Sequence, residues 1–159
     1  MPKQEELDEE IRQALTEIRM VLPGAQALLG FQLITFVLSD FEKLPQSLRE
    51  LHVVSVVFMT LSVILLMTPA SYHRIVENGE NTEHFLHFAS RMLLWALPPL
   101  ALGICGDFYV VLRTISQSVL VCGISAVALL VFFAWLWFGM PLARRAQDSR
   151  VRGTRPKAA

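Results

Sequence analysis

The sequence has 159 residues, of which 53% are hydrophobic and 18% charged, and its mean hydropathy of +0.47 is too high for an ordinary soluble domain of this size. Lysine and arginine total 14 and aspartate and glutamate also total 14, so the balanced charge argues against a nucleic-acid partner, which needs a basic excess. The composition predicts an integral protein of the lipid bilayer, with little chain left for a soluble domain.

Residues 1–19 are predicted to form an acidic amphipathic helix in the cytoplasm. Six carboxylates in this segment outnumber its three basic residues. Apolar residues recur at steps of three and four, the spacing of one helical stripe: Leu7, Ile11, Leu15, Ile18 and Leu22. The segment lacks the basic start and short apolar stretch of a signal peptide, so we expect the helix to run into the first membrane span.

Four apolar runs follow, and each is long enough to cross a bilayer: residues 20–38, 51–70, 92–112 and 119–140. Together they form a predicted transmembrane domain over residues 20–140, followed by a basic cytoplasmic tail at 141–159. The predicted fold class is all-α, an integral membrane four-helix protein with an N-terminal amphipathic cytoplasmic helix.

Proline and glycine predict where the second helix bends and ends. Pro69 is expected to kink this helix rather than stop it. The pair Asn78-Gly79 is the predicted end, because glycine readily adopts the left-handed conformation that closes a helix. Asn81 or Thr82 can then cap the next helix.

The distribution of lysine and arginine predicts the orientation in the membrane. With both termini inside, the inner segments hold eleven of these residues, and the outer loops hold only Lys43, Arg49 and Arg113. Trp135 and Trp137, near the inner end of the fourth span, fit interfacial anchoring. The sequence therefore predicts a multi-pass protein with N-in and C-in topology.

One face of the first span is the main candidate for a functional site. Residues seven apart share a stripe on a helix, and this stripe holds Arg19, Gln26, Leu33 and Asp40. Its flank holds Leu29, Gln32 and Phe36. With a cation at the inner end and a carboxylate at the outer end, the face is a candidate lining for a water-filled ion path. In the alternative interpretation the charges are ordinary interface residues and the glutamines bond to neighbouring helices.

Asp107 is a candidate intramembrane acid in the third span. At 1.5 Å per residue it lies roughly 9 Å inside the outer end marked by Arg113. An ionisable side chain at that depth suggests a functional site. Alternatively, the pair Gly106-Asp107 ends the helix early and the acid sits in a wet loop near Arg113.

The histidines and cysteines give weaker signals. Glu83, His84 and His87 could converge on a cytoplasmic metal ion, although a solvated polar face is the competing interpretation. Cys105 and Cys122 are expected at similar membrane depth, either as buried free thiols or as a disulfide. No arrangement of serine, histidine and acid suggests catalysis and no cofactor is implied, so we do not expect an enzyme.

Three segments resemble a bacterial family of small four-span membrane proteins of unassigned function. They are RMVLPGAQALLGFQ at 19–32, TPASYHR at 68–74 and the pattern W-x-W-x-G-x-P-L-x-R-R at 135–145. The resemblance covers roughly residues 17–145 and implies the fold and a bacterial origin, but no activity and no site residues. Together with the predicted spans, we expect the protein in the bacterial inner (plasma) membrane.

The first span is also similar to the pore helix of the Orai calcium channels, which carries an ALL-x-GF segment between a basic inner end and an acidic outer end. Here Ala27, Leu28, Leu29, Gly30 and Phe31 lie between the stripe's two charged ends. This sequence lacks one residue within that segment and has fewer basic residues before it. The similarity implies a ring of subunits with span one innermost.

These patterns predict a homo-oligomer that conducts ions along span one. Subunit contacts are expected to cover Gln26, Gln32 and Asp107, because a lone four-span bundle has little interior for polar groups. The alternative is a non-catalytic membrane scaffold that docks a cytoplasmic protein partner through its acidic N-terminal helix and basic tail.

Overall fold

A computed structural model of the chain describes residues 2–77, 80–116 and 118–145. Its elements in chain order are α1 (Pro2–Thr35), the short 3₁₀ helix η1 (Phe41–Lys43), α2 (Gln46–Ile75), α3 (Glu83–Ile115), α4 (Val119–Ala134) and the π-helical η2 (Trp135–Gly139). The described residues contain no strand, so the predicted all-α class is confirmed.

Four helices are long and apolar enough to cross a membrane: Gln4–Thr35, Gln46–Ile75, Glu83–Ile115 and Val119–Arg145. The number agrees with the four predicted spans. The second and third helices begin several residues before their apolar runs, because polar residues continue a helix beyond the apolar part that pattern analysis detects. This extension places His52 well inside α2 instead of at its first turn.

The predicted N-terminal helix runs into the first span without a break, and Pro23 lies inside it. The helix of the first predicted span ends at Thr35, three residues before Leu38, where the apolar run ends. Beyond Thr35 the backbone makes tighter bonds from each amide to the carbonyl three residues earlier, beginning with Phe36 N to Leu33 O at 3.3 Å.

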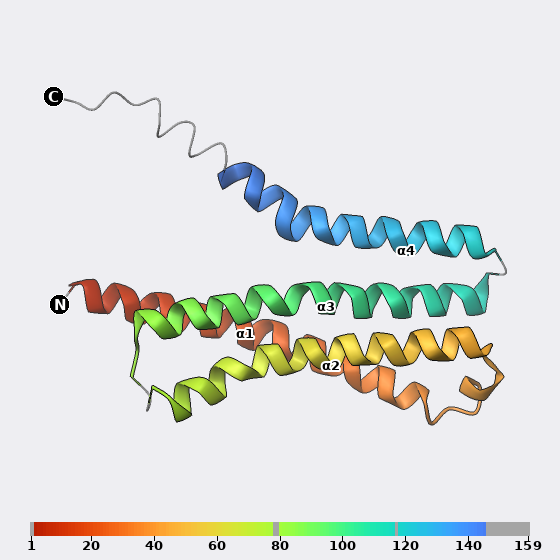
Figure 1. The fold of residues 1–159 in the computed structure, drawn as a ribbon, viewed down its shortest axis with the longest axis horizontal. Helices are drawn as coiled ribbons and strands as arrows, with labels where there is room; N and C mark the ends of the chain where they lie inside the picture. The colour runs from red at the N-terminus through yellow and green to blue at the C-terminus, as the bar shows by residue number, and fades with distance from the viewer. Residues whose placement is uncertain (1, 78–79, 117, 146–159) are drawn as a thin grey trace.

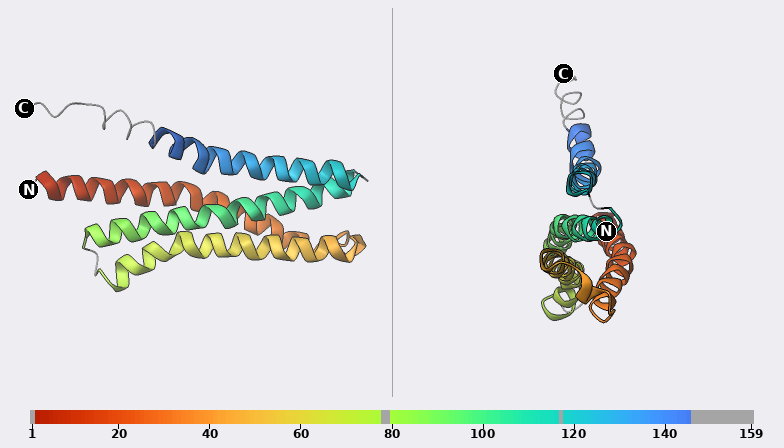
Figure 2. Two further views of the ribbon diagram at one scale, coloured as in Figure 1. Left: turned by 45° about the horizontal axis from the view of Figure 1, so that its top comes forward. Right: turned by 90° about the vertical axis from the view of Figure 1, so that its right-hand side faces the viewer.

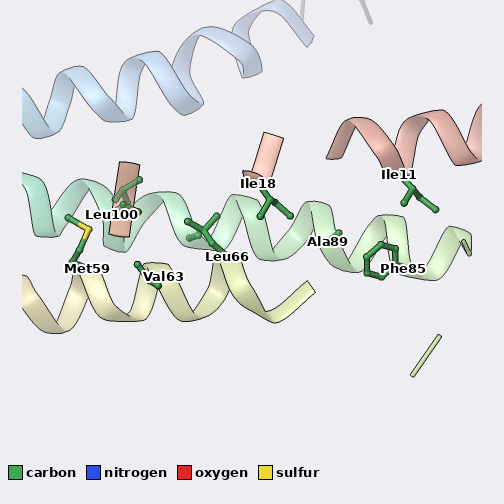
Figure 3. Packing of buried hydrophobic residues seen from close by; sticks show 10 residues of the cluster. Ile11, Ile18, Met59, Val63, Leu66, Phe85, Ala89 and Leu100 are labelled. Carbon is green, nitrogen blue, oxygen red and sulfur yellow. The ribbon is translucent and has the colours of Figure 1, made fainter. Parts of the chain in front are cut away.

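The helices α1, α2 and α3 pack together, while α4 lies outside this group and packs mainly on α3 (Figure 1; Figure 2). Ten residues of α1, α2 and α3 form the buried apolar cluster: Ile11, Ile18, Ala25, Met59, Val63, Leu66, Phe85, Ala89, Ala96 and Leu100. Figure 3 shows eight of them labelled, along the line where α3 meets the other two helices. The core therefore belongs to three helices, and α4 leaves much apolar surface exposed.

The apolar stripe of the N-terminal half of α1 is part of this core. Ile11 is 2% exposed and Ile18 6%, and Leu7, Leu15 and Leu22 pack around them. In Figure 3 the Ile11 side chain points toward the part of α3 that carries Phe85 and Ala89. The predicted amphipathic pattern is confirmed, and its apolar face is occupied by the chain's own helices.

Small residues bring α2 and α3 close together. A Cβ atom added at Gly103 would lie 3.1 Å from the backbone oxygen of Ser55, and one added at Gly106 would overlap Ser55 Oγ. Further along, the buried Ser62 hydroxyl donates to the Ala96 carbonyl oxygen at 2.9 Å. Small residues and cross-helix hydroxyl bonds are typical of helix pairs inside membranes.

The ends of α2 and α3 agree in part with the predictions. α2 continues through Pro69 to Ile75, as expected, whereas the predicted stop at residues 78–79 lies outside the described residues. Thr82 caps α3 by accepting a hydrogen bond from Phe85 N at 3.1 Å.

The fourth span changes its helical winding near its end. After Ala134 the chain forms the π-helical η2, with Met140 N bonded to Trp135 O, and then stays helical to Arg145. Pro141 explains this change, since proline has no N–H and its ring crowds the carbonyl four residues earlier. Of the predicted tail, residues 146–159 lie outside the described part of the chain.

A buried polar cluster as the candidate functional site

Three polar side chains from three helices meet near the end of the bundle where α1 connects to α2. They are Gln32 of α1, His52 of α2 and Asp107 of α3. Gln32 is 3% exposed, and the His52 and Asp107 side chains are 5% and 26% exposed. Burying polar groups costs free energy unless they form hydrogen bonds, so the burial of this cluster depends on the bonds among its members.

The cluster is held by a closed set of bonds. Gln32 Nε2 donates to Asp107 Oδ2 at 2.5 Å, and His52 Nδ1 lies 3.0 Å from Asp107 Oδ1. His52 Nε2 lies 3.1 Å from the backbone oxygen of Gln32. Each helix therefore bonds to the other two, and the cluster joins α1 to both of its neighbours.

The end of α1 explains why the Gln32 carbonyl is free to bond. A helix leaves its last four carbonyl oxygens without partners inside the helix. At the end of α1, three of these four oxygens accept a hydrogen bond from the backbone amide three residues later: Leu33 O from Phe36 N, Ile34 O from Val37 N and Thr35 O from Leu38 N. The fourth, Gln32 O, accepts from His52 of another helix. His52 thus caps the end of α1, where a cation is also favoured by the helix dipole.

Aromatic rings close the cluster on the side of the α1–α2 connection. The rings of Phe36 and Phe41 lie 5.0 and 5.7 Å from the His52 ring, measured between centroids, and 4.9 Å from each other. On the α3 side, Gly106 allows the close approach to Ser55 that brings the next residue, Asp107, to His52. The site therefore depends on the missing side chain of one glycine.

Asp107 lies inside a continuous helix, because α3 extends to Ile115. The alternative that the helix ends early at Gly106-Asp107, with the acid in a loop, is therefore wrong. The physical reason is that neighbouring residues favour helix and Gly106 is accommodated as a small residue at the α2 contact.

The predicted residues of the first span divide into two sets. Leu29 packs against the apolar core, Gln32 belongs to the buried cluster, and Phe36 is half-buried against His52. The stripe residues, in contrast, are exposed: Arg19, Gln26, Leu33 and Asp40. The structure therefore separates the flank, which packs against the chain's own helices, from the stripe, whose side chains are exposed.

The expectation that subunit contacts must cover three polar residues is corrected in part. Gln32 is buried within one chain and bonds to Asp107, whose side chain stays 26% exposed. Gln26 is exposed. The original reason for an intersubunit contact therefore no longer applies to Gln32.

The charged ends of the stripe have different surroundings. Asp40 lies in the α1–α2 connection and pairs with Lys43 at 2.6 Å between Oδ1 and Nζ, with both side chains highly exposed. Arg19 lines a cavity of about 730 Å³ between α1 and α2, together with His73 and Arg74. An exposed ion pair such as that of Asp40 adds little stability.

The predicted metal candidates are not brought together with further ligands. Within residues 2–77, 80–116 and 118–145, no group of three histidine, cysteine or acidic side chains is placed to hold a metal ion. His84 and His87 are exposed, and His84 Nδ1 lies 3.3 Å from the Tyr72 hydroxyl and 3.7 Å from Glu77 Oε1. Cys105 and Cys122 are both buried and free, which confirms the free-thiol interpretation over the disulfide.

Sequence reasoning missed His52. The apolar run begins at Leu51, so the pattern places His52 at the edge of the predicted span, whereas α2 already begins at Gln46. At 1.5 Å per residue, His52 lies about 9 Å and Asp107 about 12 Å from the ends of their helices on the same side of the bundle. This similar depth was the available signal, although depth alone does not show which helix faces face each other.

The described residues form an all-helical protein, and its four long apolar helices suggest a protein that crosses a membrane several times. More particularly, the chain belongs to the Family of unknown function (DUF6328), whose model matches residues 2–141. The predicted relation to a family of unassigned function is thereby confirmed. No curated protein and no solved structure matches the chain.

Proposed function

We propose that the chain forms a non-enzymatic homo-oligomer in the bacterial inner membrane and conducts cations along a path lined by α1. The observation that carries this proposal is the exposure of Arg19, Gln26 and Leu33 along one face of α1, together with the exposed Asp40 in the connection that follows the helix. In Figure 2, α1 lies at the edge of the group formed with α2 and α3, so α1 helices from several copies can meet around one axis.

Gln26 gives the energetic reason for covering this face. Its amide is exposed on a helix whose surroundings are apolar, and an amide without hydrogen-bond partners in hydrocarbon costs several kcal/mol, on the order of 2–7. Water in a central path, or a partner subunit, removes that cost. Both require association of several copies.

Asp40 and Lys43 define the charge at the mouth of the proposed path. Several copies of Asp40 form a carboxylate ring, which attracts cations as such rings do in cation channels. Lys43 pairs with Asp40 and opposes this attraction. Leu33 supplies an apolar constriction next to the half-buried Leu29 and Phe36.

The test is the current carried by purified protein in planar bilayers under a salt gradient. Asp40→Ala should weaken cation selectivity, Lys43→Ala should strengthen it, and Leu33→Ser should hydrate the constriction and raise the leak current. Glu42→Ala is the matched control, because Glu42 is an exposed acid on the same connection outside the stripe. Identical currents for all variants, or no current under varied pH and calcium, would refute the proposal.

The proposed orientation places both termini in the cytoplasm and both short connections, α1–α2 and α3–α4, outside. Single cysteines at Gln46 and Ser149, in a background without Cys105 and Cys122, test it in intact cells. An impermeant thiol reagent should label position 46 and spare position 149. Labelling at position 149 in sealed cells contradicts this orientation.

A scaffold that docks a cytoplasmic partner is the second candidate, and one observation favours it. The acidic half of α1 lines a polar cavity of about 510 Å³ with Glu5, Asp8, Glu9 and Arg12, next to Asn81. Most of the apolar face of this half-helix packs in the core, so a partner would bind mainly to its charged residues. Chromatography in detergent with mass measurement separates the two candidates, because a monomer excludes the ion path.

A further inference from the structure

The geometry around His52 fixes how many protons the buried cluster needs. A carbonyl oxygen only accepts hydrogen bonds, so the contact with Gln32 O requires a hydrogen on His52 Nε2. The contact between His52 Nδ1 and Asp107 Oδ1 then requires one more proton, placed on the imidazole or on the carboxyl group. In both forms the pair holds one shared proton, and its net charge is zero.

We infer that Gln32, His52 and Asp107 form a proton-binding site, in which one exchangeable proton between His52 and Asp107 keeps the end of α1 attached to α2 and α3. Proton binding itself does not depend on the proposed function. Its effect on conduction does, because the attached end of α1 leads directly into the connection that carries Asp40.

Loss of the shared proton must break one of two bonds. If the remaining hydrogen stays on Nε2, the lone pair of Nδ1 faces the Asp107 carboxylate at 3.0 Å, and that bond is lost. If the hydrogen moves to Nδ1, the lone pair of Nε2 faces the Gln32 carbonyl, and the cap on α1 is lost. No placement of a single hydrogen on the ring satisfies both oxygen atoms.

The surroundings favour a neutral, protonated pair. Gln32 Oε1 is buried without a hydrogen-bond partner among the described residues, so it adds negative potential beside the carboxylate. From the connection, the groups against His52 are the uncharged rings of Phe36 and Phe41.

Charged residues also occur on the elements that pack here. Asp40 and Lys43 of the connection pair with each other, Arg49 precedes His52 by less than one turn of α2, and Arg113 of α3 bonds Ser116 O. Among the described residues, Asp107 is the charged or titratable side chain that pairs with His52. The proton count of the site is therefore set by this pair.

The site is also accessible to protons. The Asp107 side chain is about one-quarter exposed, at 26%, whereas His52 is almost fully enclosed. Asp107 is thus the group through which a proton enters or leaves, and His52 transmits the change to α1. A purely structural cluster would not need a partly exposed acid.

Asp107→Asn is the most direct test, because asparagine can form the same hydrogen bonds as Asp107 but does not need the shared proton. Its amide nitrogen can donate to a neutral His52 Nδ1, and its oxygen can accept from Gln32 Nε2, so both contacts and the cap on α1 remain. The variant should fold, and it should lose the pH dependence that the shared proton confers. His84→Gln is the matched control, since His84 is an exposed imidazole at the other end of the bundle.

The first readout is the unfolding equilibrium of the full chain in mixed detergent micelles. Above the ordinary pKa of histidine an unfolded chain carries no proton on either group, whereas the two bonds of the folded cluster need one. The unfolding constant of the wild type and of His84→Gln should therefore rise up to tenfold more per pH unit than that of Asp107→Asn. Equal pH dependence in the wild type and Asp107→Asn would overturn the inference.

The second readout does not require reversible unfolding. Nitrogen NMR of histidine-labelled protein in lipid nanodiscs follows the two His52 ring nitrogens, which His52→Gln identifies. In the wild type these signals should report a protonated pair at neutral pH and should change at the higher pH at which the folded cluster releases the shared proton, whereas in Asp107→Asn they should stay constant through that change. Signals of an unprotonated pair at neutral pH in the wild type, or equal changes in both proteins, refute proton binding. A pH-independent current alongside a titrating His52 refutes only the link to conduction.

Discussion

The contact between α2 and α3 predicts that adding single methyl groups on α3 will destabilise the fold. Gly103 and Gly106 are the positions, and alanine is the smallest change at each. A Cβ atom at Gly103 would lie 3.1 Å from Ser55 O and 3.3 Å from Met59 N, both of which are backbone atoms. Since backbone cannot rotate away, the two helices must separate by a few tenths of an ångström.

Gly106→Ala meets a side chain instead. Its Cβ would overlap Ser55 Oγ and lie 3.2 Å from Ser55 Cβ. Rotation of the serine relieves the first contact but not the second, and it breaks the bond from Ser55 Oγ to Leu51 O. Overpacking of this kind costs about 1–3 kcal/mol, so each alanine should raise the unfolding constant roughly 5- to 150-fold.

Two other glycines serve as controls within the same chain. An added Cβ at Gly30 of α1 or Gly123 of α4 meets no atom within 4 Å. Alanine there should stabilise the helix by about 0.5–1 kcal/mol, because it removes the entropic cost of glycine. The predicted gap between the two pairs of variants is therefore roughly 1.5–4 kcal/mol.

Titration with a denaturing detergent, followed by circular dichroism, measures these differences in the full chain. The variant Ser55→Ala should be nearly neutral alone and should recover part of the loss in Gly106→Ala, giving a coupling energy of about 0.5–2 kcal/mol in a double-mutant cycle. If Gly103→Ala and Gly106→Ala are as stable as Gly30→Ala, the close approach of α2 and α3 is refuted.

Three further predictions follow from buried contacts. Ser62→Ala removes the bond to Ala96 O and should cost about 0.6–1.7 kcal/mol, whereas the same change at the exposed Ser71 should cost nothing measurable. Ile11→Ala should cost about 2–5 kcal/mol and expose the first half of α1 to protease, and unchanged proteolysis would show that this half-helix is not docked. Cys105 and Cys122 should react with a maleimide only after unfolding, and each should add one label per chain, so a disulfide-linked pair would contradict the free thiols.

The helices were predictable because their signal is local. Each span carries a mainly apolar run long enough to cross a bilayer, and the stripe from Leu7 to Leu22 repeats at the helical period. The helix ends were less predictable, since they depend on which carbonyl finds a partner. The last turn of α1 is an example, because it depends on His52, which lies 20 residues away in sequence.

The polar cluster was only partly predictable for a related reason. Periodicity placed Gln32 beside the stripe and depth singled out Asp107, but neither shows which faces of different helices meet. Which faces meet depends on small residues such as Gly106, which allows α2 and α3 to approach closely because it has no side chain. The pattern of apolar and polar residues along the sequence does not predict such a close approach of two helices.

Stability and the candidate site are consequently parts of one arrangement. The contact between Gly106 and Ser55 allows α2 and α3 to lie close together, and this brings Asp107 Oδ1 to 3.0 Å from His52 Nδ1. His52 in turn caps α1. A shift of a few tenths of an ångström between α2 and α3 would therefore lengthen the bond that shares the proton before it disrupted the apolar core. Gly106→Ala should for this reason change the pH dependence of the cluster, whereas Gly103→Ala, one turn further from Asp107, should reduce stability with a smaller effect on it.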